Sequence, residues 1–240
     1  MSRKIGNCRS FGTCMYHVSM KKEFPARGLF PKCFHSPIHV SIRYTESTAI
    51  ALAKEALAAA GENGRVACVS CPTLYKALVD VVKDEAASGV AAASADSSTP
   101  SVGSPSSRRA IVLEFDRRFA KWGADFVFYD YKDDSIPELP VGWRNSFDVV
   151  VCDPPFLTED CAAATLKAAE ETLGKKPLST STSTASPTCK VMFCTGEIME
   201  ETLRKLSDGA LRKSETFVPE HASKLSNPFV LMTNFDTTTL

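Results

Sequence analysis

The sequence predicts an α/β fold in which helices cover both faces of a mostly parallel sheet. Short apolar runs alternate with longer helix-forming segments, which is the order that such folds require. The run from Phe147 to Cys152 lacks polar alternation, as expected of a parallel strand buried on both faces. Pro154 and Pro155 then end the strand at once. Because ligands bind outside the carboxyl ends of strands in open α/β sheets, we expect chemistry in the loop after Cys152.

The composition indicates one globular domain with a basic N-terminal end. The chain has 240 residues, of which 44% are hydrophobic, and this is enough for one sizeable core. Residues 1–40 contain seven Lys or Arg and one acid, Glu23, so 21 basic and 27 acidic residues remain in the rest. A mildly acidic main part argues against broad binding to nucleic-acid phosphates. We therefore do not expect a nucleic-acid partner.

Cysteine usage favours a reducing compartment. The nine cysteines are an odd number and are scattered through expected strands and helices, unlike a disulfide framework. Cys68 and Cys71 match C-x-x-C, but no second pair stands at zinc spacing, so we expect no metal site. No apolar run reaches the roughly 18 residues that a membrane span needs. We expect a cytoplasmic protein that does not bind membranes.

Parts of the chain are not expected to join the packed domain. Residues 1–40 mix Gly, Pro, Cys, His and basic residues without a period, which predicts a poorly ordered extension before a domain at residues 41–240. An organellar targeting peptide is the alternative for this extension. The stretches at about 86–109 and 177–189 are of low complexity and rich in Ser, Ala or Thr. They have little to bury, so we predict surface insertions.

Caps and apolar periods define the expected elements. Thr45 can cap the first helix and Gly61 can end it, while Pro72 suits the first turn of the second. Helices are expected over residues 46–60, 73–85, 159–173 and 197–206. Strands are expected over residues 65–70, 110–115, 125–130, 147–152 and 190–195. Two joined strands, 214–219 and 229–235, would close the sheet with an antiparallel edge strand.

Acidic side chains follow two of the expected strands. Glu114 ends the second strand, and Asp116 lies two residues on and points to the same side. In nucleotide-binding sheets a carboxylate at this position accepts hydrogen bonds from ribose hydroxyls. Asp130 and Tyr131 follow the third strand, and their carboxylate and ring suit the edge and face of an adenine. Together these positions predict a nucleoside-binding edge.

The turn after the first strand contains no glycine. Dinucleotide-binding and S-adenosylmethionine-binding folds usually carry Gly-x-Gly there, so that the backbone can approach the ligand closely. Here Ser70, Cys71 and Pro72 occupy the turn, which argues against pyrophosphate binding of the NAD type. S-adenosylmethionine has no phosphates to hold, so its binding is affected less.

The segment Asp153-Pro154-Pro155-Phe156 is suited to methylating an amine. Methyl transfer requires a neutral nitrogen whose lone pair is aimed at the methyl group. The Asp153 carboxylate, helped by a proline carbonyl, can accept the amine N–H bonds and so orient that lone pair. Phe156 can pack on a planar base or on the alkyl-ammonium end of a lysine. The rigid pair Pro154 and Pro155 would hold both groups in place.

At this point the sequence resembles the family of elongation factor 1-alpha lysine methyltransferase 1, once described as N6-adenine methyltransferase-like. The resemblance implies a Rossmann-like, seven-strand methyltransferase sheet and S-adenosyl-L-methionine as cofactor. It also implies a protein substrate, elongation factor 1-alpha. The glycine-free first turn is typical of that family. The matching stretches are residues 65–70, 113–119, 126–131, 147–156, 194–200 and 217–221.

The same resemblance assigns roles to individual residues. Asp153 to Phe156 look like the catalytic loop. Glu114 and Asp130 look like the acids on the cofactor side, where we also place Ser70, Asp116 and Tyr131. The family usually has a Ser-Gln-Phe-Trp-Tyr-like segment before the first helix. Here only Tyr44 and the hydroxyl residue Thr45 are kept, and we expect both at the cofactor.

Three functions follow from these observations. The first is a cytosolic, S-adenosylmethionine-dependent protein-lysine methyltransferase that acts on elongation factor 1-alpha. The second is an adenine-N6 nucleic-acid methyltransferase, because the same tetrapeptide could grip an exocyclic amine. The third is a methyltransferase-fold binding protein that has lost catalysis, which the altered segment before Tyr44 motivates. His221 is expected to line or buttress the site rather than to act as a base, because methyl transfer to an amine needs positioning more than a strong base.

Overall fold

A computed structural model describes residues 44–89, 110–133, 139–175, 189–222 and 227–240. The α-helices are α1 (Glu46–Ala60), α2 (Pro72–Gly89), α3 (Glu159–Lys167) and α4 (Glu200–Leu206). Short helical segments are η2 (Arg117–Asp125), η3 (Ala168–Leu173) and η4 (Glu197–Met199). The strands are β1 (Val66–Val69), β2 (Ala110–Glu114), β3 (Phe126–Phe128), β4 (Val149–Cys152), β5 (Lys190–Gly196), β6 (Arg212–Lys213) and β7 (Phe229–Thr233).

The strands form one seven-stranded sheet in the order β3-β2-β1-β4-β5-β7-β6. Strands β1 to β5 are parallel, whereas β7 runs antiparallel to both of its neighbours. The predicted fold class is therefore confirmed. Its antiparallel strand β7 is not the outermost, because the two-residue strand β6 lies beyond it.

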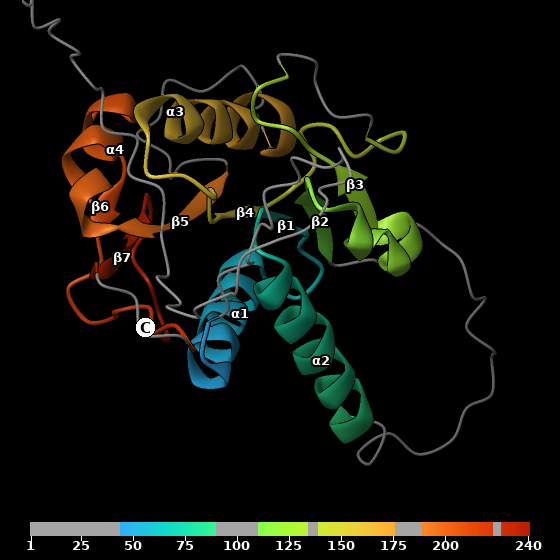
Figure 1. The fold of residues 1–240 in the computed structure, drawn as a ribbon. Coiled ribbons are helices and arrows are strands. Elements are labelled where there is room, and N and C mark those ends of the chain that lie inside the picture. The colour runs from blue at the N-terminus through green and yellow to red at the C-terminus, as the bar shows by residue number, and fades with distance from the viewer. Residues whose placement is uncertain (1–43, 90–109, 134–138, 176–188, 223–226) are drawn as a thin grey trace, which may run out of the picture. The chain divides into compact units, whose positions relative to one another are not determined.

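Helices cover both faces of the sheet (Figure 1). Val66 and Cys68 of β1 point into a buried cluster with α1 and α2. Ala67 and Val69 point the other way, into a cluster with α3, η3 and α4. Every residue of β1 and β4 is buried. This two-sided burial explains why both strands read as continuous apolar runs.

The first helix begins and ends where its capping residues predict. The Thr45 hydroxyl accepts a hydrogen bond from the Thr48 N–H at 3.2 Å, which satisfies one of the free donors of the first turn. Gly61 follows the helix with a φ of 81°, a left-handed conformation that glycine adopts at little cost. The helix is rich in alanine, and its buried face includes Leu52, Ala53 and Ala56.

Several boundaries differ from the sequence prediction for local reasons. Helix α2 continues to Gly89, into the stretch predicted as an insertion, because Ala86 and Ala87 favour helix. The helix predicted over residues 159–173 changes to π-helical geometry at Ala168. The strand predicted over residues 214–219 lies earlier, at β6, where two exposed basic residues give no apolar alternation to detect.

The predicted extension at residues 1–40, residues 90–109 of the first insertion and residues 177–188 of the second lie outside the described residues. Helix α2 is the longest described helix, and neither it nor any other helix in the described ranges has the length and apolarity to cross a membrane.

Candidate active site

Three strand ends bring together residues that the sequence places far apart. In the register of the sheet, Val69 of β1 lies opposite Leu113 of β2 and opposite Cys152 of β4. One residue further on, the Ser70 N–H donates to the Leu113 carbonyl at 2.8 Å, and the Asp153 N–H donates to the Val69 carbonyl at 3.0 Å. Glu114, Ser70 and Asp153 therefore stand side by side at the carboxyl edge of three neighbouring strands.

Ser70 takes the backbone conformation that glycine usually supplies at this turn. Its φ is 58°, in the left-handed region, although it carries a side chain. Such a conformation costs a non-glycine residue about 1–2 kcal/mol, and it persists only where surrounding structure enforces it. The turn after β1 therefore has a left-handed residue, as glycine would allow, although Ser70 occupies the position.

The acids that follow β2 differ in what holds them. The Glu114 carboxylate accepts the Asp116 N–H at 3.1 Å, and burial raises its pKa above the ordinary value. The Asp116 carboxylate instead caps η2 by accepting the Arg118 N–H at 2.9 Å and forms an ion pair with the Arg118 guanidinium at 2.5 Å. Within the described ranges, Asp116 is therefore paired with a basic side chain, whereas Glu114 is not.

The residues after β3 lie beside the tetrapeptide that follows β4. The Asp130 carboxylate accepts the Lys132 N–H at 3.0 Å, closing a turn after the strand. The ring of the next residue, Tyr131, lies 5.7 Å from the ring of Phe156, centroid to centroid. Tyr131 packs against the core cluster on the α3 face of the sheet. The predicted site residues Tyr131 and Phe156 are thus brought together as one aromatic pair.

Asp153 has an unusual environment for a carboxylic acid. Protein atoms surround its carboxyl group, although the residue keeps some contact with solvent. Burial raises its pKa to about 7, helped by the negative charge of Glu114 and opposed by the Tyr44 hydroxyl. Pro154 is buried and Pro155 is half-buried, so the loop after β4 is held within the structure. The carboxyl group changes its charge near neutral pH, as expected of a group in an active site.

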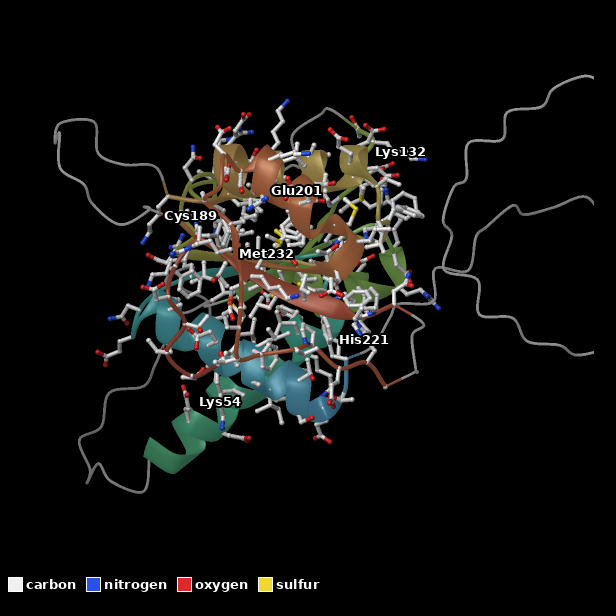
Figure 2. All side chains as sticks on the ribbon, turned by 90° about the vertical axis from the view of Figure 1, so that its left-hand side faces the viewer. Lys54, Lys132, Cys189, Glu201, His221 and Met232 are labelled. Atoms are coloured by element: carbon white, nitrogen blue, oxygen red, sulfur yellow. The ribbon has the colours of Figure 1, made fainter. Side chains whose placement is uncertain are left out.

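Tyr44 and His221 complete this part of the edge. Tyr44 forms an isolated antiparallel bridge with His221, and their ring centroids lie 4.8 Å apart. In Figure 2 His221 lies close to the start of α1. Tyr44 lies beside Asp153 and Cys194, whereas the Thr45 hydroxyl caps α1. The sequence predicted that His221 lines or buttresses the site, but not its pairing with Tyr44, because 177 positions separate the two residues.

The order of the sheet, with carboxylates at the ends of β2 and β4, agrees with a methyltransferase. The chain belongs to the family described as "Probable N6-adenine methyltransferase", whose model matches residues 43–237. The proteins called "EEF1A lysine methyltransferase 1" from Mus musculus and Danio rerio are each 37% identical to it, over 194 and 199 residues. Each match covers 80% of this chain, and it covers 72% of the mouse protein and 94% of the zebrafish protein.

A more distant relative has a similar name. "Protein-lysine N-methyltransferase EFM5" of Saccharomyces cerevisiae is 31% identical over 197 residues, which cover 80% of this chain and 69% of the yeast protein. The chain is accordingly a methyltransferase. Methyltransferases with this fold in general take their methyl group from S-adenosylmethionine.

Proposed function

We propose that this chain is an S-adenosylmethionine-dependent protein-lysine N-methyltransferase whose substrate is elongation factor 1A. The observation that carries the proposal is the position of Asp153, a protein-enclosed carboxyl group at the end of β4. It stands one strand away from Ser70 and two strands away from Glu114. A nucleoside bound at Glu114 and an amine bound at Asp153 would meet beyond the carboxyl end of β1, the strand that lies between β2 and β4.

The residues at the ends of β1 to β3 fit the proposed cofactor. When bound, S-adenosyl-L-methionine supplies an electrophilic methyl group on a positively charged sulfur. The Glu114 carboxylate would accept hydrogen bonds from ribose hydroxyls, and Asp130 and Tyr131 would contact the adenine. The left-handed backbone at Ser70 allows a close approach without glycine. Asp116, with its carboxylate engaged by Arg118, would support the shape of this edge.

The loop after β4 would prepare the substrate. Ionised Asp153 accepts N–H bonds from the lysine amine, which turns the nitrogen lone pair toward the methyl group. Pro154 and Pro155 limit the movement of this carboxylate. Phe156, packed on Tyr131, would border the alkyl part of the lysine. These contributions are positional, as expected for a transfer in which the cofactor carries the reactive group.

The names of the relatives favour a protein substrate over a base. The mouse and zebrafish relatives are called EEF1A lysine methyltransferase 1, and the yeast relative a protein-lysine N-methyltransferase. The name of the family model favours the alternative, adenine-N6 methylation. A site that orients an amine beside an aromatic ring suits both chemistries. The excess of acidic residues after residue 40 favours a protein, because nucleic-acid binding depends on contacts from basic side chains.

The test is an assay with the full chain, labelled S-adenosylmethionine, and either purified elongation factor 1A or nucleic acid. We expect label in the protein, on lysine, and a loss of at least about 100-fold in kcat for Asp153→Ala. Asp148→Ala is the matched control, because Asp148 lies just before β4, at the opposite end of this strand. Its carboxylate accepts the Arg65 N–H at 2.9 Å and pairs with Lys175. That variant should lose thermal stability but keep its kcat.

Two results would contradict the proposal. Label in DNA or RNA instead of protein would establish adenine methylation. No label in either substrate, together with no calorimetric binding of S-adenosylmethionine, would favour the third function, a methyltransferase-fold binding protein that has lost catalysis.

A further inference from the structure

Two segments that lie far apart in the sequence, the start of α1 and the loop that carries His221, are hydrogen-bonded to each other near Asp153. The Thr45 N–H donates to the Glu220 carbonyl at 2.9 Å, and the Glu220 N–H donates to the Thr48 hydroxyl at 3.1 Å. These bonds flank the bridge between Tyr44 and His221. The start of α1 therefore fixes the backbone of the loop that carries His221.

Ring packing fixes the two side chains as well. The Tyr44 ring is tilted by 34° against the His221 ring, with 4.8 Å between their centroids. On its other side the His221 ring meets Phe229 edge-on, with 4.2 Å between centroids. Tyr44 is only 4% exposed. The Tyr44 ring is therefore shut off from solvent, and the His221 ring is held between two aromatic neighbours.

This packing leaves two buried polar atoms without a partner. The Tyr44 hydroxyl and the His221 Nε2 atom are both buried without a well-formed hydrogen bond to a residue in the described ranges, although the Tyr44 hydroxyl is within reach of the Asp153 carboxyl group and the Cys194 thiol. A buried polar atom without a partner is unfavourable and calls for an explanation. A second buried tyrosine behaves differently, because the Tyr75 hydroxyl donates to the Asp125 carboxylate at 2.9 Å.

The Tyr44 ring lies beside Asp153 and Cys194, and the His221 ring packs against Tyr44. The Tyr44 hydroxyl is close enough to both to change their titration. The other titratable groups around Asp153 are neutral thiols and one acid, and burial raises the pKa of each of them. They are Cys71 at the start of α2, Cys152 on β4, Cys194 on β5 and Glu114 on β2. Burial lowers the pKa of His221 to about 4, so its imidazole is neutral.

We propose that the Tyr44 hydroxyl and His221 Nε2 are binding groups for the reacting amine of the substrate, and that with Asp153 they form its receptor. This inference rests on the proposed function and assigns two further residues to it. An amine supplies the N–H donors that both atoms lack. With the imidazole proton on Nδ1, Nε2 is an acceptor, and a phenol oxygen accepts as well. Tyr44, predicted at the cofactor, is thereby assigned to the substrate.

The acceptors of the receptor can hold the N–H bonds of the substrate nitrogen before, during and after the methyl transfer. The lysine ammonium first loses one proton to solvent, which leaves two N–H bonds and one lone pair. Acceptors around the N–H bonds leave the lone pair facing the methyl group. The new N–C bond forms from this lone pair as the S–C bond breaks, and its electrons stay on sulfur. A neutral thioether and a positively charged methylated amine result.

A binding experiment tests the receptor without a protein substrate. Sinefungin carries an ammonium group near the position of the transferable methyl, whereas S-adenosylhomocysteine has no group there. In calorimetric titrations of the full chain, Tyr44→Phe should weaken sinefungin binding about tenfold and change S-adenosylhomocysteine binding less than about twofold. Equal effects on both ligands would overturn the proposal and return Tyr44 to the cofactor. No effect on either would also overturn it.

Turnover separates this role from a structural one. Tyr44→Phe should lower kcat about tenfold or more while changing thermal stability little, because the Tyr44 hydroxyl forms no well-formed hydrogen bond to a described residue. The profile of kcat against pH should move to higher pH in this variant, because the Tyr44 hydroxyl lowers the pKa of Asp153 in the wild-type protein. Tyr75→Phe is the matched control and should lower the melting temperature without changing kcat. Wild-type-like turnover and an unchanged pH profile in Tyr44→Phe would overturn the proposal.

His221 is tested by two amides of different length. Gln reaches the position of Nε2, whereas Asn reaches only that of Nδ1, and both lose the ring contact with Phe229. We expect His221→Gln to keep several-fold more activity than His221→Asn at equal stability. Equal activities would remove His221 from the receptor. Wild-type chain that binds cofactor but modifies no protein would contradict the proposed function alone, because the sinefungin comparison would still decide the receptor.

Discussion

The two sides of the active site are built in different ways. The β2 side consists of Ser70, Glu114 and Asp116, and its two carboxylates are held by groups within two residues of themselves along the chain. The β4 side consists of Asp153, Tyr44 and His221, which three distant segments contribute and which leave two buried polar atoms without a described partner. The carboxylates of the first side are held by their near neighbours in the chain, whereas the polar atoms of the proposed receptor would be satisfied by a bound amine.

The largest effect on cofactor binding should come from removing the Glu114 carboxylate on the β2 side. Glu114→Ala should weaken binding of S-adenosylhomocysteine about 10- to 100-fold, the range for hydrogen bonds to a charged group. Turnover at saturating cofactor should change little, because the β4 side is intact. Asp116→Ala is the matched control, and calorimetry should find less than about a threefold change, since Arg118 already engages that carboxylate. A larger effect at Asp116 than at Glu114 would reverse the assignment of the two acids.

An intermediate effect should appear in stability at the β4 side. The pKa of Asp153 in the folded protein is about 7, against 3.8 for the ordinary group. Between these two values the unfolded chain has already lost the proton that the folded chain keeps, so wild-type stability falls as pH rises through this window. Asp153→Asn lacks this loss and should be more stable than wild type by about 1–2 kcal/mol at pH 8, allowing for partial solvent access.

Chemical denaturation at about pH 4 and about pH 8 checks this difference, which should nearly vanish at the lower value. Asp148→Asn, at the other end of β4, should be less stable than wild type at both values, because it weakens the ion pair with Lys175 and the bond from the Arg65 N–H. An Asp153→Asn variant without any gain at high pH would mean that the carboxyl group is better solvated than its surroundings indicate.

The smallest effect should come from the strained turn after β1. Ser70→Gly should change the free energy of unfolding by less than about 1 kcal/mol, because relief of the left-handed conformation is offset by the greater freedom of glycine when unfolded. Ser70→Val should lose about 2 kcal/mol, since a β-branched side chain tolerates this conformation poorly. Both values come from denaturant titrations. Equal stability of the two variants would show that the turn relaxes to an ordinary conformation.

The β2 side could be predicted from the sequence because its geometry is local. A buried apolar run followed by Glu114 places a carboxylate at the end of a strand, whatever the rest of the chain does. Asp116 was predicted at the same strand end. Its ion pair with Arg118 was not predicted, because it depends on η2, a helical segment that the sequence did not indicate. The roles of these residues in binding stay predictions until the cofactor titrations are done.

The β4 side shows what sequence patterns leave open. The loop at Asp153 was visible as an apolar run that ends in two prolines. Nothing in the sequence linked Tyr44 to His221, because 177 positions separate them and only the folded sheet makes them neighbours. The short strand β6 was not predicted for a related reason. Its two exposed basic residues pair with β7 through backbone atoms, which leave no side-chain pattern in the sequence.

By itself, the sequence determined the order of the α-helices and of strands β1 to β5 and β7, the caps of α1 and the acids at the strand ends. These features depend on the spacing of apolar residues and on hydrogen bonds between residues that are close in the sequence, so the sequence alone specifies them. The tertiary structure alone decided that Ser70 adopts a left-handed conformation, that the Tyr131 and Phe156 rings are neighbours, and that Tyr44 lies beside Asp153 and is bridged to His221. Each of these depends on which distant segments share the carboxyl edge of the sheet, and packing of the whole core sets that arrangement.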